Sequence, residues 1–306
     1  MPDEAGAASG SASSPATVGF IGLGNMGIPM VTNLVAAGFD VVASDVSPEA
    51  RARAADAGAS AVDTAPEVAA AASTVILMLP NSQIVKSVVD SIVGSLAPGS
   101  LIVDMSSSEP LRTRELAEQL ATRRIRMIDA PVSGGVGGAV AGKLTIMVGG
   151  SSADVASATP VLAAMGRVVS AGPIGAGHAI KALNNLLSAT HLWITAEAMT
   201  AGERFGLDPA VMLEVFNSSS GRSGSTENKF PNFVLTERYD SGFGLRLMLK
   251  DMRIATELAS QVGVPSVLGE DAVALWAEAA DELDPAADHT RVAQYVATVE
   301  RGVAAT

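Results

Sequence analysis

Three glycines near the amino end of the chain have a spacing that suits phosphate binding. The run VGFIGLGNMG places Gly22, Gly24 and Gly27 directly after a short apolar stretch, and Asp45 closes a second apolar run, VVASD. In such a motif the first glycine permits a tight strand-to-helix turn, the second lets the backbone approach a pyrophosphate, and the third lets the helix pack closely on its strand. The pyrophosphate would bind free N–H groups at the start of the helix. The pattern predicts a dinucleotide-binding βαβ unit.

The acidic residue after the second strand bears on which dinucleotide binds. A carboxylate about 20 residues beyond the glycines accepts hydrogen bonds from the ribose hydroxyls, and it would repel a 2′-phosphate. We therefore expect NAD, with NADP the less favoured cofactor. The cofactor contacts expected from this unit are Gly22, Leu23, Gly24, Asn25, Met26, Gly27 and Asp45.

A lysine and two amides stand together in the segment GAGHAIKALNN, residues 175–185. Lys181 and Asn185 are four residues apart, so on a helix they share one face. A lysine on a solvated face is the ordinary interpretation. Here, however, the neighbours Ile180 and Leu183 are apolar, so the helix has little polar face to spare. Together with Asn184, these residues favour a functional site near a domain junction.

A serine followed by two glycines forms the third candidate. Ser133, Gly134 and Gly135 follow the strand-like segment RIRMIDAP and can offer a hydroxyl and backbone N–H groups to a carboxylate. Taken alone, this pattern is more typical of an ordinary glycine turn. Its meaning depends on the other motifs.

Composition excludes several classes of function. The chain has 306 residues, of which 48% are hydrophobic, and its formal net charge of −12 would repel nucleic acid and anionic membranes. Its lack of cysteine excludes disulfides, thiolate nucleophiles and cysteine-ligated metals, and a cytoplasmic location is expected. His178, His191 and His289 are too scattered for a metal site. The uncharged stretch 18–39 is broken by glycines and Pro29, which argues against a membrane span.

Helical and strand-like segments alternate after Asp45. This alternation predicts a mainly parallel sheet whose loops gather at one edge, so Leu79, Pro80 and Ser107 should border the cofactor there. The expected helices are 48–58, 81–96 and 109–123, and the expected strands are 73–80, 100–106, 124–131, 143–150 and 166–173.

The pattern changes near Gly177, where a long helix over residues 178–205 is expected. Beyond it lies helical patterning broken by two loops, SSSGRSGST and YDSGFG. We expect three parts: a disordered tail over residues 1–16, an NAD-binding Rossmann domain over 17–177, and a helical substrate and oligomerisation domain over 178–306.

Taken together, the motifs resemble the β-hydroxyacid dehydrogenase family, most closely its 3-hydroxyisobutyrate dehydrogenase-type members. They are GFIGLGNMGIPM, MLP, DAPVSGG, GAGHAIKALNN and the pair Lys250-Asp251 in MLKDMRIA, in this order along nearly the whole chain. The resemblance implies a Rossmann-type doubly wound, mainly parallel α/β sheet followed by an all-helical domain. It also implies NAD-dependent oxidation of a small carboxylate-bearing β-hydroxy acid to its semialdehyde or keto acid, by a homodimer or homotetramer.

The resemblance also assigns roles to individual residues. Lys181 would be the general acid/base, and its pKa would have to fall in a dry cleft for it to act as a base near neutral pH. Independently of the resemblance, Arg222 lies in the loop SSSGRSGST and could supply a second carboxylate contact, although loop arginines are usually solvated. The catalytic set would be Lys181, Asn185 and Ser133. The substrate contacts would be Ser133, Gly134, Gly135, Lys181, Asn184 and Asn185, and further cofactor contacts would be Leu79, Pro80, Ser107, Phe243 and Lys250.

Two alternatives stay open at this stage. A reductase of a semialdehyde or imine belongs to the same family, but the imine branch typically replaces the lysine that Lys181 matches. A catalytically silent nucleotide-binding module is the alternative from another class. Many relatives carry Asn-Arg after the second strand and use NADPH, whereas this chain has Asp45-Val46. The motifs do not name the hydroxy acid.

Overall fold

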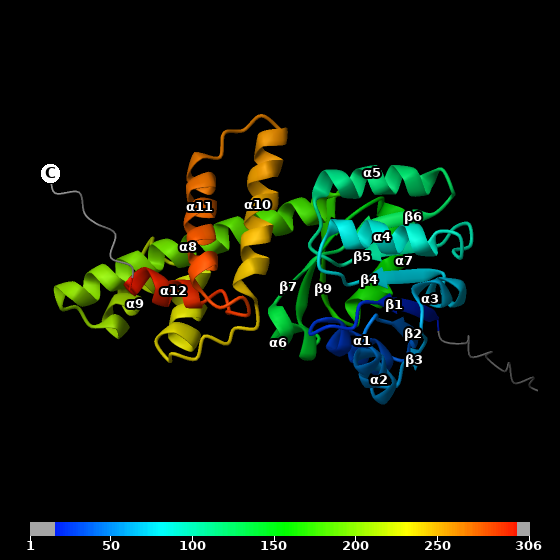
Figure 1. Cartoon of the computed structure of the whole chain (residues 1–306), viewed down its shortest axis with the longest axis horizontal. Coiled ribbons are helices and arrows are strands. Elements are labelled where there is room, and N and C mark those ends of the chain that lie inside the picture. The colour runs from blue at the N-terminus through cyan, green and yellow to red at the C-terminus, as the bar shows by residue number, and fades with distance from the viewer. Residues whose placement is uncertain (1–15, 299–306) are drawn as a thin grey trace, which may run out of the picture.

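The structure is a computed structural model that describes residues 16–298. The tail predicted for residues 1–16 therefore lies almost wholly outside the described residues. Two bodies follow one another along the long axis of the molecule (Figure 1). One is built on a β-sheet and the other consists of helices, and the helix α8 runs through both.

Within residues 16–298 the strands form one sheet in the order β3-β2-β1-β4-β5-β6-β8-β7, with β9 beside β8. The strands from β3 to β6 pair in parallel, whereas β8 is antiparallel to β6 and β7. This confirms the predicted doubly wound, mainly parallel sheet. The strands are β1 (Thr17–Ile21), β2 (Asp40–Ser44), β3 (Ser60–Ala61), β4 (Thr74–Leu77), β5 (Leu101–Asp104), β6 (Arg126–Asp129), β7 (Val132–Ser133), β8 (Leu144–Gly149) and β9 (Gly166–Gly172).

Helices cover both faces of the sheet, and this explains why its strands are continuous apolar runs. Met30 of α1 and Leu162 of α7 belong to the core on one face, whereas Val89 of α4 and Leu116 of α5 belong to the core on the other. The first face carries α1 (Gly27–Ala36), α2 (Pro48–Asp56), α6 (Gly135–Val140) and α7 (Ser152–Ala163), and the second carries α3 (Ala65–Ala71), α4 (Ser82–Ile92) and α5 (Pro110–Ala121).

Several short elements were not among the expected ones. The strands β3 and β7 have two residues each, and the helices α3 and α6 have seven and six. The longer helix α7, with 12 residues, was also not among the expected elements. The start of α3 carries a capping box in which Thr64 and Glu67 satisfy each other's backbone N–H groups. Elements this short carry too little periodicity to be recognised from the sequence.

The long helix α8 (Ala176–Phe205) begins two residues before its predicted start and ends at Gly206, whose φ of 98° is the left-handed conformation typical of a helix end. It contacts β8 and β9 of the sheet and also α10 and α12 of the helical body. One rigid element thus connects both bodies.

The helical body has its own core, which includes Trp193, Met252 and Trp276. The predicted loop over 218–226 ends earlier than expected, because a π-helix begins at Ser225. The elements are α9 (Pro209–Ser218), η1 (Ser225–Val234), α10 (Leu245–Gln261), α11 (Val267–Glu282) and α12 (Arg291–Thr298). Among the described helices, none has the length and apolar character required to cross a bilayer.

Candidate active site

The glycine loop has the geometry that each of its glycines was expected to provide. Gly22 follows β1 with a φ of 104°, and a Cβ there would collide with the carbonyl oxygen of Met78. A Cβ on Gly27 would collide with the carbonyl oxygen of Gly22, so the start of α1 packs closely on the turn. A Cβ on Gly24 would meet no atom within 4 Å. The loop is therefore tight at its first and third glycines and open at the second, which suits a bound pyrophosphate.

Asp45 ties the glycine loop to the end of β2. Its Oδ2 accepts a hydrogen bond from the backbone N–H of Leu23 at 2.6 Å, and its Oδ1 accepts one from the N–H of Ser47 at 2.8 Å. The carboxylate thus shapes the loop in addition to any contact with a ribose. An Asp45 variant would disturb both functions.

The loops after β4 and β5 meet at the same edge of the sheet. The N–H of Leu79 donates to the hydroxyl of Ser106 at 2.9 Å. Lys250 reaches this edge from α10, and its Nζ donates to the carbonyl oxygens of Pro80 at 3.1 Å and Ser107 at 2.8 Å. The structure therefore brings together Leu79, Pro80, Ser107 and Lys250, as expected for residues that border one cleft.

Lys181 and Asn185 are buried on the inner face of α8. Their relative exposures are 8% and 4%, whereas Ile180 and Leu183 on the outer face are 43% and 42% exposed. This is the reverse of an ordinary surface helix, which buries its apolar residues and exposes its lysines. Asn184, the other predicted substrate contact on α8, is exposed and is not part of the inner face.

An acidic residue of α10 organises the buried amide. Asp251 is 1% exposed, and its Oδ2 accepts a hydrogen bond from Asn185 Nδ2 at 2.6 Å. Its Oδ1 lies 3.2 Å from Nζ of Lys250. Asp251 therefore connects the edge of the sheet at Pro80 and Ser107, the cofactor edge expected from the sequence, to the inner face of α8. The sequence singles out Asp251 only as part of the motif pair Lys250-Asp251, and its proximity to Asn185 has no local signal.

The environment of Lys181 favours its neutral form. Burial lowers the pKa of Lys181, the charge of Asp251 acts in the opposite direction, and the charge of Lys250 lowers it again. The Nζ of Lys181 lies 5.8 Å from the centre of the Phe243 ring. An amine in such a place can accept a proton at a lower pH than a solvated lysine can.

The serine-glycine segment lies at the start of α6. Ser133 ends β7, and Gly134 and Gly135 have φ values of 129° and 62°. A Cβ on Gly135 would lie 3.7 Å from the carbonyl oxygen of Ser241, so this turn borders the loop that carries Phe243. Backbone in this conformation can present N–H groups to an anion without an intervening side chain.

Asp129 binds backbone N–H groups at the beginning of α8. Its carboxylate accepts hydrogen bonds from the N–H groups of Gly175 at 2.7 Å and His178 at 2.8 Å. Burial raises the pKa of Asp129, and His178 acts in the opposite direction. The ring of His178 pairs with Thr113, since its Nδ1 lies 2.8 Å from the threonine hydroxyl. These contacts set the position of Lys181 one turn further along the helix.

Other candidates lie elsewhere. Arg222 Nε lies 3.6 Å from Glu227 Oε1, and both side chains are largely exposed. His178 and His289 are buried and His191 is exposed. Over residues 16–298 no group of three or more metal-ligating side chains converges.

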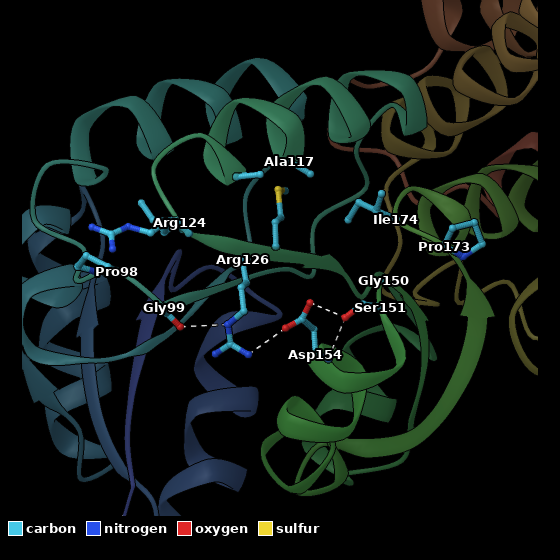
Figure 2. A pocket seen from close by; sticks show the side chains of 13 residues that line it. Pro98, Gly99, Ala117, Arg124, Arg126, Gly150, Ser151, Asp154, Pro173 and Ile174 are labelled. Carbon is cyan, nitrogen blue, oxygen red and sulfur yellow. Dashed lines mark hydrogen bonds and ion pairs between the residues drawn. The ribbon is translucent and has the colours of Figure 1, made fainter.

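Figure 2 shows a pocket of about 800 Å³ in a different place. It lies between α5, the start of β6 and the start of α7, where Arg126 bonds to Gly99 and to Asp154. Pro80, Ser107 and Lys250, which mark the edge where the cofactor is expected, are not part of its lining. None of the predicted site residues lines this pocket, so its size does not mark the active site.

The fold and the site together define a nicotinamide-dependent dehydrogenase, and comparison with known proteins agrees. Residues 17–175 match the family described as the NAD-binding domain of 6-phosphogluconate dehydrogenase. Residues 175–296 match the family described as NAD-binding of NADP-dependent 3-hydroxyisobutyrate dehydrogenase.

Individual relatives cover most of the chain. The mitochondrial 3-hydroxyisobutyrate dehydrogenase of Bos taurus is 41% identical, over 86% of this chain and 81% of the relative. The NAD-dependent L-serine dehydrogenase of Pseudomonas aeruginosa is 39% identical, over 85% of this chain and 90% of the relative. A structure of Mycobacterium tuberculosis 3-hydroxyisobutyrate dehydrogenase with L-serine has a TM-score of 0.87 at 32% identity, and covers 92% of this chain and 99% of its own.

The chain belongs to the β-hydroxyacid dehydrogenase family, among its 3-hydroxyisobutyrate dehydrogenase-type members. It is accordingly an oxidoreductase that acts on the CH–OH group of a hydroxy acid with a nicotinamide cofactor.

Proposed function

We propose that the protein oxidises a small β-hydroxy acid to its semialdehyde or keto acid, with NAD preferred over NADP. The observation that carries this proposal is the buried pair Lys181 and Asn185 on the inner face of α8, held by Asp251 next to the cofactor edge of the sheet. The bovine and Pseudomonas relatives act on 3-hydroxyisobutyrate and L-serine, which are both β-hydroxy acids.

Each residue has a chemical task in this proposal. Lys181 Nζ accepts the proton of the substrate hydroxyl, which requires the neutral amine that burial favours. Asn185 orients the lysine and the hydroxyl. Ser133, Gly134 and Gly135 bind the carboxylate, which must be held locally because the chain has a net charge of −12.

The residues present suit a dinucleotide. The open backbone at Gly24 and the start of α1 would hold the pyrophosphate, and Asp45 would bind the adenosine ribose. Leu79, Pro80, Ser107, Phe243 and Lys250 would complete the cofactor site. A bound nicotinamide supplies the hydride acceptor.

A substrate panel tests the proposal. The panel contains 3-hydroxyisobutyrate, 3-hydroxypropionate, glycerate, threonate and L-serine, each assayed for NADH and NADPH formation. We expect turnover of at least one acid with a higher kcat/KM for NAD. An enzyme that reduces NADP faster than NAD would contradict the cofactor proposal. If no acid is turned over but NADH binds, a catalytically silent module becomes the better explanation.

We further propose a homodimer or homotetramer. The outer face of α8 exposes Ile180, Leu183, Leu187 and Ile194, and such a stripe on a helix is typical of a surface that another chain covers. Light scattering after size-exclusion chromatography measures the mass, and a monomer would contradict the proposal.

A cytoplasmic location remains a proposal based on the lack of cysteine. The name of the bovine relative places that protein in mitochondria. Fractionation of the native cells tests the location proposed for this protein.

A further inference from the structure

A second acidic residue, Asp288, lies in the connection between α11 and α12 and binds the loop before α10. Its Oδ2 accepts hydrogen bonds from the N–H groups of Gly242 at 2.9 Å and Phe243 at 3.2 Å. Both of its carboxylate oxygens lie 2.9 Å from the hydroxyl of Ser241. One side chain therefore accepts hydrogen bonds from three donors of this loop, namely the hydroxyl of Ser241 and the N–H groups of Gly242 and Phe243.

The residues on either side of Asp288 reinforce the contact. The N–H of His289 donates to the carbonyl oxygen of Phe243 at 2.8 Å, and the N–H of Leu245 donates to that of Ala287 at 2.8 Å. The rings of Phe243 and His289 meet edge to face with their centres 5.8 Å apart. Asp288 is itself oriented by Thr290, whose hydroxyl donates to Oδ1 at 2.6 Å.

The loop held in this way reaches the catalytic lysine on one side and the serine-glycine turn on the other. The Phe243 ring lies 5.8 Å from Nζ of Lys181. The carbonyl of Ser241 lies beside Gly135. Asp288 is 45 residues beyond Phe243 in the sequence. Because it binds this loop, it acts on the immediate surroundings of the proposed base.

We propose that Asp288 is a positioning residue of the active site, which clamps the segment Ser241–Phe243 so that the Phe243 ring stays beside the Lys181 amine and keeps water from it. The role of Lys181 as the base rests on the proposed function above. The clamp itself is a contact between side chain and backbone that stands whether or not that function holds.

The charged groups around the lysine define the expected effect. Asp251 and Lys250 of α10 both influence the Lys181 amine. Lys229, Asp288 and His289 influence one another beside the Phe243 loop. If Asp288 acted on Lys181 only through its negative charge, its removal would make the ammonium less stable and lower the pH at which the lysine titrates. If it acts as a clamp, its removal admits water to the amine, which stabilises the ammonium and raises that pH.

The test compares Asp288→Ala, Asp288→Asn, Phe243→Ala and the double variant Asp288→Ala/Phe243→Ala. The matched control is Asp284→Ala in the same connection. Among the described residues, the Asp284 carboxylate accepts only the N–H of Ala286. Two readouts are measured. The first is the pH dependence of kcat for hydroxy acid oxidation. The second is an NMR titration of protein labelled with ¹³C-lysine, in which the Lys181 signal is assigned by its loss in Lys181→Met.

We expect the Lys181 titration to move to a higher pH by about one pH unit in Phe243→Ala and in Asp288→Ala. The double variant should show no further shift, because Phe243→Ala deletes the ring and Asp288→Ala lets the same ring move away from the amine. Asp288→Asn, which keeps one acceptor oxygen, should show a smaller shift in the same direction, and Asp284→Ala should show none.

A shift to lower pH in Asp288→Ala, no shift at all, or additive shifts in the double variant would overturn the clamp. The NMR readout needs no substrate, so it separates this proposal from the proposed function. If the Lys181 signal shifts as expected while the kinetic profile does not follow it, the clamp stands and the assignment of Lys181 as the base fails. Circular dichroism confirms that each variant is folded before it is compared.

Discussion

A lysine that is buried without a directly bonded carboxylate destabilises the folded state. Among the described residues, no carboxylate lies within 4.0 Å of Lys181 Nζ, although Asp251 is near enough to influence its pKa. Burial of an ammonium disfavours its charge, and a fold that needs only stability would place an apolar residue there. This destabilisation supports the proposal that Lys181 has a chemical role.

The first prediction at the residue scale separates chemistry from structure at Lys181. Lys181→Met should lower kcat at least about a hundredfold, because a general base contributes on the order of 10² to 10⁴ in rate. It should leave the melting temperature unchanged or higher, since a buried charge is replaced by an apolar chain of similar size. Kinetics and thermal unfolding measure both effects, with Lys86→Met as a surface control. A normal kcat with a lower melting temperature would show that Lys181 is structural.

The same variant makes a prediction about pH. Because burial lowers the pKa of Lys181, the rate of oxidation should rise with pH and level off below the range of an ordinary lysine. The rising limb should be absent from the residual activity of Lys181→Met. An unchanged profile would place the base elsewhere.

The second residue-scale prediction concerns Asp45. Asp45→Asn removes the charge and keeps an oxygen that can accept from the N–H of Leu23 or Ser47. It should therefore shift the ratio of kcat/KM for NAD over NADP toward NADP by about tenfold, because the repulsion of the 2′-phosphate disappears while part of the loop contact remains. Asp45→Ala would be a poorer test, since it releases the glycine loop as well. Asp40→Asn at the other end of β2 is the control. An unaltered ratio in Asp45→Asn would mean that the carboxylate is only a support for the loop.

At the scale of elements, the start of α8 decides where the proposed base lies. Asp129 holds two of the first N–H groups of this helix, and it is fully buried. These N–H groups have no partner inside the helix, so they need an acceptor from elsewhere.

Asp129→Ala should lower the free energy of unfolding by about 2–4 kcal/mol, because it leaves buried N–H groups without an acceptor. It should also lower kcat, since Lys181 is one turn further along the helix. The control is Asp154→Ala near the start of α7, whose ion pair with Arg126 is partly exposed and should contribute less than about 1 kcal/mol. Denaturant unfolding measures both. Equal losses in the two variants would contradict the special role of Asp129.

At the scale of the whole molecule, the free energy of unfolding should depend on pH through His289. Burial, followed by the charge of Lys229, lowers the pKa of His289 to about 4, while Asp288 and the carbonyl of Phe243 act in the opposite direction. In the unfolded chain its pKa returns to about 6.5. Between these values the unfolded state binds more protons, so stability must fall as the pH falls from about 6.5 to about 4.

This loss should amount to about 3 kcal/mol in the wild type, from the difference between the two pKa values. The variant His289→Asn cannot gain a proton, and its amide can replace the contacts of Nδ1 with Ser241 and Phe243. Its unfolding free energy should therefore depend less on pH in this window. The measurement is denaturant unfolding at several pH values from 7 to 4. Parallel curves for the two proteins would show that His289 is not the group responsible.

How far the sequence determined this protein depends on how local each feature is. The glycine loop, the acid after β2 and the alternation of strands and helices are set by neighbouring residues, so they could be predicted from the sequence. The pair Lys181 and Asn185 could be placed on one helix face for the same reason. Elements of two to seven residues, such as β3, β7 and α3, were missed because a period cannot be recognised over so short a length.

Only the tertiary structure decided which face of α8 is buried and what meets it there. The apolar neighbours of Lys181 suggested a helix without a polar face, and the structure shows that they are its exposed side. The bond from Asn185 to Asp251 joins residues 66 apart in the chain, and the bond from the N–H of Phe243 to Asp288 joins residues 45 apart. Contacts of this range depend on how the helices pack on one another. No spacing within either segment could have indicated them.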